Sequence, residues 1–316
     1  MSRTKRGPEE AKTEEPAADS GRRTSPLPPD ADLNGSTLQM GFLTSNTAAP
    51  LQPRRSATTM AAGAFYLPKE SKKRPLGEDA HFIFPEGQTI GVADGVGAWS
   101  FHGVDAGKYS RMLMSKAEAS ARSQAGGGGG VNPMKALTDA YAGTNVLGSS
   151  TACILTLTDD GVISAVNVGD SGLAIVRAGS VEYKSPVQQR EFNYPFQLGR
   201  GIWSDRPAVA ARIKVEVRPG DVIVMATDGL FDNVKDELVA ELVGGGADAP
   251  GKVAERLAKE ALKIAKSKDV ETPIALEARK AGIEYSGGKY DDITVIVAYI
   301  EAAADQSGTI AVNLGT

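Results

Sequence analysis

The stretch TIGVADGVGAWSFHG, residues 89–103, joins a short apolar strand directly to an Asp-Gly pair, Asp94 and Gly95. Asp-Gly is a common turn signal between two strands. Here a glycine-rich bend and then helical sequence follow the pair, and a two-residue hairpin has no use in that position. The question is whether Asp94 forms a turn or is held at a strand end because something binds it.

Composition limits the classes of protein to consider. The chain has 316 residues, 41% of them hydrophobic, which is enough for one sizeable core of strands and helices. No window approaches the roughly 18 uninterrupted apolar residues of a membrane span. The net charge of -4, with both signs interspersed, argues against nucleic acid or an anionic membrane as the main partner. The single cysteine, Cys153, lies in an apolar run, so we expect a buried structural thiol.

The composition also divides the chain into a folded domain and two tails. Residues 1–58 mix charges, Pro, Ser and Ala without a hydrophobic period, which is typical of a disordered segment. Acidic residues near the start argue against a signal or transit peptide, so cytoplasm or nucleus is favoured and organelle import is left open. We expect the folded domain over 59–302 and a short C-terminal tail over 303–316.

The folded domain alternates apolar strands with amphipathic helices. Helices are expected from about residue 104 to the glycine run at 126–130, from Asn132 to near Gly148, and two or three times across 235–281. The segment 186–207 is long, aromatic and irregular, which is typical of a flap over a site or of a poorly ordered loop.

Carboxylates recur at the strand ends of this pattern. Three aspartates each end an apolar strand and a pair begins the last one: Asp94, Asp170, Asp228, Asp291 and Asp292. Glu78 and Asp79 also begin a strand. If the last strand runs antiparallel to the others, all of these carboxylates lie at one edge of the sheets. The pair Asp160-Gly161 stands between two strands and is expected to be an ordinary hairpin turn.

Crowded carboxylates repel one another, so such an edge is stable only if cations neutralise it or the pKa values rise. The chain has one cysteine and only two histidines, so the available ligands are oxygen atoms. Oxygen ligands point to Mg²⁺ or Mn²⁺ rather than zinc.

Five motifs follow one another in a characteristic order across residues 62–300: GEDAHF, GVADGVGAW, NVGDSGLAIVR, ATDGLFDNV and KYDDITVIVAYI. In this order they resemble the metal-dependent type 2C protein serine/threonine phosphatases, and ADGVGAW is most similar to the short plant and fungal branch. The resemblance implies an α+β fold, in which two antiparallel sheets pack as a sandwich flanked by helices. It makes 59–302 the catalytic domain.

The activity implied by the resemblance is hydrolysis of phosphoserine and phosphothreonine in proteins by a hydroxide that bridges two Mg²⁺ or Mn²⁺ ions, without a phosphoenzyme intermediate. The partners would be phosphorylated proteins, with no nucleic acid or membrane, and we expect a monomer. Carried onto this chain, Asp94 would bridge both metals and the Gly95 carbonyl would bind one of them. Asp228 and Asp291 would bind the other.

The resemblance assigns further roles around this pair of metals. Glu78 and Asp79 would hold metal-bound waters. Asp170 and Asp232 match positions that in related phosphatases contribute, with Asp228, to a possible third and weaker metal site. Arg74 stands at the family spacing for the arginine that binds substrate phosphate. Its flanking residues match poorly, however, so Lys72 or Lys73 is an alternative and a solvated basic run is another.

One position departs from the family pattern. Many members have a histidine directly after the Asp-Gly, thought to protonate the leaving alkoxide, and Val96 stands there in this chain. General acid catalysis contributes about 10²–10⁴-fold, so either a metal-bound water donates the proton or the rate is lower. His102 is a candidate substitute acid, against the alternative of a plain surface histidine.

Val96 also motivates a second function: a catalytically weak family member that binds phosphoproteins or kinases as a regulatory module. The intact carboxylate set favours the enzyme, because an inactive relative has little reason to keep every metal position. A phosphotransferase with an aspartyl nucleophile would need Asp-x-Asp after a strand, and neither VADGVG nor MATDGL provides it.

Overall fold

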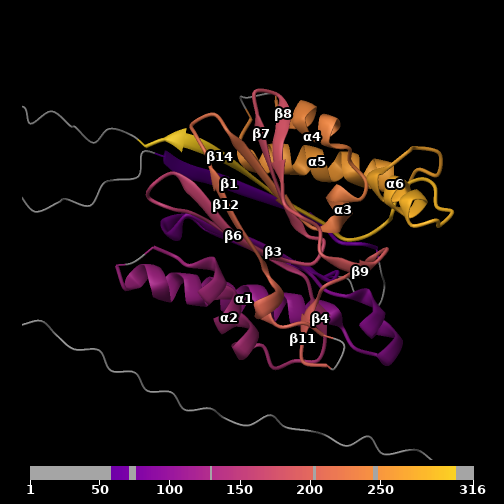
Figure 1. The fold of residues 1–316 in the computed structure, drawn as a ribbon, viewed down its shortest axis with the longest axis horizontal. Helices are drawn as coiled ribbons and strands as arrows, with labels where there is room; N and C mark the ends of the chain where they lie inside the picture. The colour runs from indigo at the N-terminus through magenta and orange to yellow at the C-terminus, as the bar shows by residue number, and fades with distance from the viewer. Residues whose placement is uncertain (1–57, 71–75, 129, 202–203, 245–247, 304–316) are drawn as a thin grey trace, which may run out of the picture. The chain divides into compact units, whose positions relative to one another are not determined.

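The computed structural model describes residues 58–70, 76–128, 130–201, 204–244 and 248–303 (Figure 1). Apart from Thr58 and Ala303, both predicted tails lie outside the described residues. Within the described part, none of the helices has the length and apolar character needed to cross a bilayer.

Two five-stranded sheets form the centre of the domain. The first has the order β1-β14-β13-β7-β8, with β1 (Thr58–Leu67), β7 (Gly172–Arg177), β8 (Ser180–Lys184), β13 (Val222–Ala226) and β14 (Ile293–Ala302). The second has the order β12-β6-β5-β3-β2, with β2 (Asp79–Phe84), β3 (Thr89–Asp94), β5 (Ala152–Leu157), β6 (Val162–Val168) and β12 (Ala211–Glu216). All pairings in both sheets are antiparallel.

The two sheets pack face to face over a shared apolar core. Along β5, Cys153 and Leu155 point into this core, whereas Ile154 points to the opposite face, because successive side chains of a strand alternate. Ile175 and Ile296 meet them from the first sheet. Burial raises the pKa of the Cys153 thiol to about 12, as expected of a structural cysteine. The predicted α+β sandwich is confirmed.

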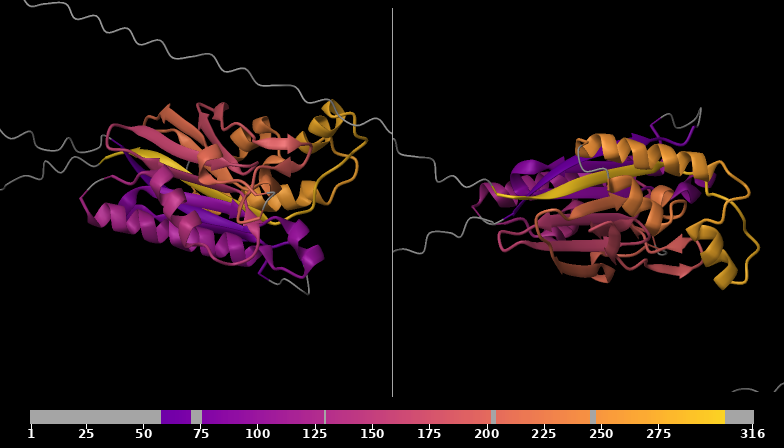
Figure 2. Two further views of the ribbon diagram at one scale, coloured as in Figure 1. Left: turned by 60° about the horizontal axis from the view of Figure 1, so that its bottom comes forward. Right: turned by 90° about the horizontal axis from the view of Figure 1, so that it is seen from above.

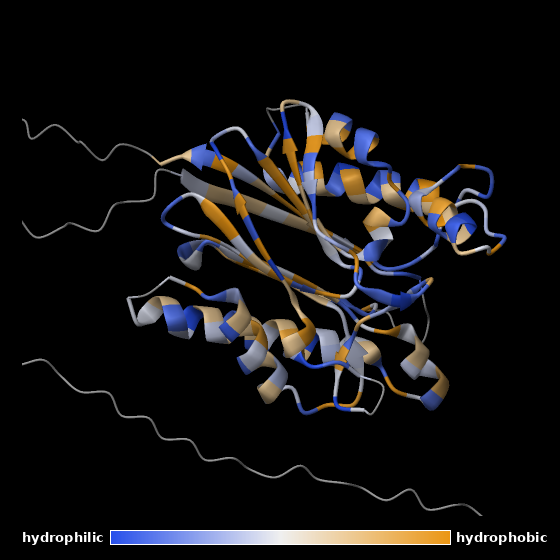
Figure 3. Cartoon of the chain, in the orientation of Figure 1, coloured by the Kyte–Doolittle hydropathy of each residue, from blue (hydrophilic) through white to orange (hydrophobic). Residues whose placement is uncertain are grey.

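Helices cover the outer faces of both sheets (Figures 1 and 2). The helices α1 (Ala106–Gly126) and α2 (Pro133–Gly143) share an apolar cluster with the second sheet. The helices α4 (Asp236–Val243) and α5 (Pro250–Ala265) share one with the first sheet, and α3 (Asp228–Phe231) and α6 (Pro273–Lys280) complete the helical elements of the described residues. Hydrophobic and hydrophilic residues are interspersed along the helices and several of the strands (Figure 3).

The helices α1 and α2 each begin directly after a residue whose side chain caps the helix. The Asp105 side chain accepts a hydrogen bond from Gly107 N at the start of α1, and Asn132 caps α2 ahead of Pro133. The α2 helix ends at Gly143, earlier than the expected Gly148. Arg200, distant in sequence, donates to the carbonyl oxygens of Ala142 and Thr144 and so satisfies the helix end.

Several local features complete the fold. The short elements are η1 (Pro85–Gly87), η2 (Gly97–His102), β4 (Ser149–Ser150), β9 (Gln189–Glu191), β10 (Tyr194–Pro195), β11 (Leu198–Gly199) and η3 (Pro207–Val209). Asp160 and Gly161 form the predicted turn between β5 and β6, where Gly161 has a φ of 77°. The strand β1 is rich in small residues and carries no clear alternation, so the sequence pattern does not reveal it.

The strand β1 depends on a glycine where α5 crosses it. A Cβ on Gly63 would clash with the backbone of Gly251 in α5, although the φ of Gly63 suits any residue. We expect Gly63→Ala to lower the free energy of unfolding by about 1–3 kcal/mol, because the helix must move away from the strand. Chemical denaturation measures this. The matched Gly251→Ala adds a Cβ in open space and should change stability by less than about 1 kcal/mol. Equal effects of the two variants would contradict the close contact.

Candidate functional site

A cavity of about 850 Å³ opens where the carboxylate-bearing strand ends of the two sheets meet. Its lining includes most of the predicted metal ligands: Glu78, Asp94, Gly95, Asp170, Asp228 and Asp291. The second sheet supplies Asp94 at the end of β3, and the first sheet supplies Asp228, just after β13, and Asp291, just before β14. The strands β13 and β14 are antiparallel, so the end of one lies beside the start of the other, as the sequence predicted.

Asp79 joins the two sheets at this edge. It is the register partner of Asp94 in the β2–β3 pair and is 3% exposed. Its Oδ2 accepts hydrogen bonds from Thr227 Oγ1 at 2.9 Å, directly after β13, and from Thr294 Oγ1 at 2.8 Å, in β14 of the first sheet. Burial and the neighbouring carboxylate of Asp292 raise the pKa of Asp79 well above its ordinary value. A buried carboxylate therefore connects the two halves of the site.

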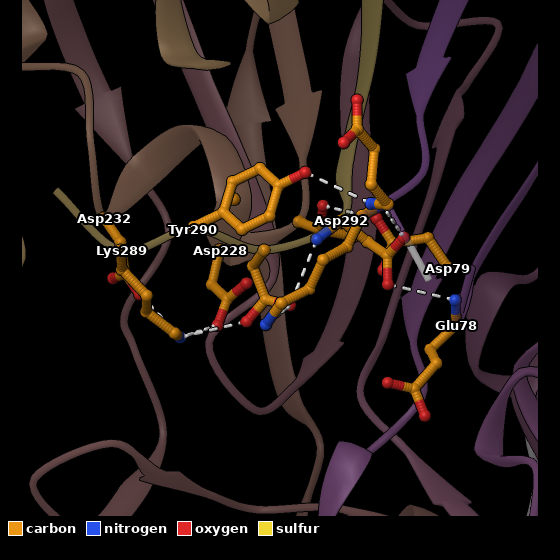
Figure 4. Close-up of polar contacts among 12 residues, drawn as sticks. Glu78, Asp79, Asp228, Asp232, Lys289, Tyr290 and Asp292 are labelled. Atoms are coloured by element: carbon orange, nitrogen blue, oxygen red, sulfur yellow. Dashed lines mark hydrogen bonds and ion pairs between the residues drawn. The ribbon is translucent and has the colours of Figure 1, made fainter. Parts of the chain in front are cut away.

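Asp292 fixes the segment that carries Glu78. Its carboxylate accepts hydrogen bonds from the backbone of Glu78 at 3.0 Å and of Lys69 at 2.7 Å, and from the Tyr66 hydroxyl at 3.0 Å (Figure 4). Gly77, with a φ of 65°, passes so close to Asp292 and Tyr66 that a Cβ there would clash with both. Asp291 and Asp292 both line the cavity, but Asp292 is 3% exposed and positions its neighbours, whereas the Asp291 side chain is 28% exposed.

The carboxylates at this edge repel one another strongly. Burial, and then the charges of Asp79, Asp228 and Asp291, raise the pKa of Asp94 well above its ordinary value. Burial and Asp228 act in the same way on the pKa of Asp170 and Asp291, and burial raises the pKa of Asp232 to about 6. This is the electrostatic state expected of such an edge before a cation binds.

The oxygen atoms of this edge fit hydrated divalent cations. Within the described part of the chain, Asp79 Oδ1, Asp170 Oδ1 and Asp228 Oδ1 are buried without a hydrogen-bond partner. A buried carboxylate oxygen without a donor is costly, and a cation would satisfy it. No group of three or more His, Cys, Asp or Glu among the described residues converges into a finished metal cage. Mg²⁺ needs no such cage, because it keeps several waters and uses one or two carboxylates.

Lys289 is a cation at the centre of the site that sequence reasoning missed. Its ammonium lies 2.8 Å from Asp232 Oδ2 and 3.9 Å from Asp291 Oδ2, and it also pairs with Asp228 (Figure 4). Burial lowers the pKa of Lys289, but these carboxylates together raise it well above its ordinary value. No signal in KYDD distinguishes this lysine from a solvated one, because the pairing comes from tertiary structure.

The predicted phosphate-binding residue and its alternatives, Arg74, Lys72 and Lys73, lie outside the described residues. Lys69 is a further cation at the cavity that sequence reasoning did not single out. Its ammonium is 3.6 Å from Asp291 Oδ1 and 5.8 Å from the centroid of the Tyr290 ring.

The rim of the cavity is partly aromatic. Trp99 and Phe101 of η2 line it, and the Phe101 side chain is 89% exposed. Val96 and His102 line it too, and the His102 ring is 6.3 Å from the Trp99 ring. The segment 186–207 contributes Asn193, Tyr194, Pro195, Gln197, Gly201 and Ser204 to the lining. The flap alternative for this segment is therefore the one that fits.

Known proteins are similar to this chain in sequence and in fold. A family model described as Stage II sporulation protein E matches residues 85–301. Probable protein phosphatase 2C 55 of Arabidopsis thaliana is 39% identical over 290 residues, which cover 91% of this chain and 62% of the relative. Probable protein phosphatase 2C 80 of the same plant is 40% identical over 86% of this chain and 64% of the relative. The chain thus spans less than two thirds of the length of both plant relatives.

A shorter relative and two solved structures extend the comparison. The protein phosphatase PTC7 homolog fig of Drosophila grimshawi is 39% identical over 72% of this chain and 80% of the relative. The X-ray structure of the photosystem II phosphatase PBCP superposes with a TM-score of 0.72 at 30% identity, covering 77% of this chain and all (100%) of that chain. The catalytic domain of the serine/threonine phosphatase PstP, in complex with two manganese ions, gives 0.55 at 17% identity, covering 77% and 99%, and supports the fold alone.

The raised pKa values make the metal-free domain sensitive to pH. The pKa values of Asp79, Asp94 and Asp170 are higher in the folded state than in unfolded aspartates, so stability falls as pH rises through the folded-state values. In the presence of a chelator, the melting temperature should therefore increase by several degrees as the pH is lowered from about 8 to about 5. Saturating Mg²⁺ should remove most of this dependence, because the cation neutralises the same carboxylates.

Asp94→Asn is the control for this pH dependence. It removes one of the carboxylates that repel one another. It leaves His81 in place, so any pH dependence that comes from this histidine, whose pKa is lowered by burial, stays the same. The variant should melt higher than the wild type at about pH 8 without metal and show a smaller pH slope. A wild-type domain that loses stability on going from about pH 8 to about pH 5 would show that repulsion does not govern this edge.

Proposed function

The chain belongs to the protein phosphatase 2C family, and from this premise we propose that it hydrolyses phosphoserine and phosphothreonine in proteins with two Mg²⁺ or Mn²⁺ ions. The observation that carries the proposal is the group of carboxylates from both sheets at one cavity edge, where Asp79, Asp170 and Asp228 each have a buried oxygen with no hydrogen-bond partner in the described part of the chain. When bound, two divalent ions acidify a water so that it can attack phosphorus, and they neutralise the phosphoryl oxygens. Residues 59–302 would form the catalytic domain.

The proposed ligands come from opposite sheets. Asp94 at the end of β3 would hold both ions, with the Gly95 carbonyl on one and Asp228 and Asp291 on the other. The lining of the cavity by all four residues supports this assignment. Since one ligand set spans the gap between the sheets, metal binding would also fix the sheets relative to each other.

The acidic pair at the start of β2 would orient water. Asp79 has one oxygen occupied by two threonine hydroxyls and a second that is buried without a partner among the described residues. Glu78 lines the cavity, and Asp292 holds its backbone. Carboxylates fixed in this way accept hydrogen bonds from a metal-bound water without reorganising, which is how residues behind the ligands tune a metal site.

Substrate phosphate would meet positive charge at the cavity mouth. Arg74 remains our prediction for this contact, and Lys69 is a second candidate because it lines the cavity beside Asp291. The leaving alkoxide needs a proton, and Val96 offers none. Either a water held by the ions would supply this proton or the rate would be lower, and His102 is a candidate substitute acid because it lines the same cavity.

The alternative function is a catalytically weak regulatory module that binds phosphoproteins or kinases. Val96 lies at the cavity where many family members carry histidine, which favours this alternative. The carboxylate set at the same cavity favours the enzyme, since a binding module has no need of several carboxylates that repel one another. We also retain a monomer as a prediction.

Hydrolysis of a phosphothreonine peptide tests the proposal. The wild type should release phosphate with Mn²⁺ or Mg²⁺ and stop when chelator is added. Asp228→Asn should reduce kcat/KM by ~100-fold or more, because it removes a charge that holds a metal. The matched control is Asp160→Asn, which alters the aspartate of the Asp-Gly hairpin far from the cavity and should leave the rate unchanged.

The outcome separates the two functions. Activity that needs the metal and is lost only in Asp228→Asn supports the phosphatase and shows that Val96 is tolerated. A folded wild type that binds Mn²⁺ without releasing phosphate would instead favour the regulatory module.

A further inference from the structure

We propose that Lys289 is an internal cation that takes the place of a third metal ion in this centre and positions Asp228 for one of the two remaining ions. The inference rests on the proposed function in so far as it assumes a two-metal phosphatase centre. Its direct evidence is the environment of the Lys289 ammonium.

The ammonium lies among the carboxylates that would form a third metal site. It pairs with Asp228 and lies 2.8 Å from Asp232, and its charge also acts on Asp170. These three aspartates are the set that the family resemblance assigned to a third, weaker ion. An ammonium carries one charge and three donors, so it satisfies several oxygens at once. The ammonium would exclude a divalent ion from this position, because it fills the space and its positive charge repels the ion.

Hydrogen bonds between Asn233 and the backbone of Lys289 hold the lysine in place. Its N–H donates to Asn233 Oδ1 at 2.8 Å, and Asn233 Nδ2 donates back to the Lys289 carbonyl at 2.9 Å. Asn233 also donates to the carbonyl of Gly229, and its side chain is 2% exposed. Since Asn233 follows α3, it fixes the lysine relative to Asp228, the first residue of that helix. The Lys289 side chain is only 16% exposed, so it has little room to leave.

This arrangement divides the two oxygens of Asp228 between different partners. Oδ2 pairs with Lys289, whereas Oδ1 is buried and has no hydrogen-bond partner among the described residues. The lysine therefore fixes the carboxylate plane and leaves one oxygen for a metal ion. Residues that hold a ligand from behind raise metal affinity by orienting it, and Lys289 is a positioning residue of this kind.

The inference predicts how many ions the centre binds. Wild-type protein should bind two Mn²⁺ at saturation, counted by the electron paramagnetic resonance signal of free Mn²⁺ during titration. Lys289→Met keeps the length of the side chain and removes its charge, so it should bind a third Mn²⁺. Lys289→Arg keeps the charge and should bind two. Lys266→Met is the matched control, because Lys266 contacts the Tyr290 ring and, among the described residues, forms no ion pair with a carboxylate of the centre.

A second readout needs no metal and no activity. In chelator, Lys289→Met should melt several degrees below the wild type, because Asp228 and Asp232 lose their counter-charge. Adding Asp232→Asn to Lys289→Met should restore most of this loss and abolish the third ion. A lysine that served only to fill space would not be rescued by neutralising a carboxylate.

The ion counts and melting temperatures decide whether Lys289 has this role. A wild type that binds three ions, or a Lys289→Met protein that binds two and melts like the wild type, would overturn the inference. Phosphothreonine hydrolysis is measured in parallel: predicted ion counts without hydrolysis would refute the proposed function and leave Lys289 in its role. Hydrolysis together with the same ion count in the wild type and in Lys289→Met would support the proposed function and refute the role of Lys289. A wild type that binds no Mn²⁺ would contradict both the proposed function and this inference.

Discussion

Repulsion among buried carboxylates at the open edge between two sheets is the constraint on which the site depends. Asp94 comes from one sheet and Asp228 and Asp291 from the other, and burial combined with their mutual charge raises the pKa of Asp94 and Asp291. Burying charge in this way costs stability unless cations compensate it. Lys289 offsets part of this cost, because its ammonium pairs with Asp228 and Asp232. An edge arranged like this is poised for divalent cations, which is the basis of the phosphatase mechanism proposed for it.

Much of this edge could be predicted from local sequence. Apolar strands followed by Asp94 and Asp228, and the strand that begins after Asp291, define where the carboxylates lie once the last strand is antiparallel. The internal hairpin at Asp160 distinguishes a turn from a binding aspartate, because strands flank it on both sides. The family motifs then supplied the sandwich, which no periodicity in the chain specifies.

The remaining features depend on contacts between distant segments. The role of Lys289 requires α3 and the start of β14 to lie together through Asn233, and no pattern near residue 289 indicates this. The early end of α2 depends on Arg200, far along the chain. The strand β1 is made of small residues that pair with β14 and leave room for α5, so neither its alternation nor its hydrophobicity is distinctive. In each case the deciding interaction is tertiary.

The most direct test of the account is the position of the metals themselves. Crystals grown with Mn²⁺ should show two anomalous-difference peaks roughly 3.5–4 Å apart. Asp94 should contact both peaks, Asp228 and Asp291 one of them, and the Lys289 ammonium should remain between Asp228 and Asp232. No peak at the edge between the sheets, or peaks that Asp94 does not contact, would contradict the claim that these carboxylates form a metal centre.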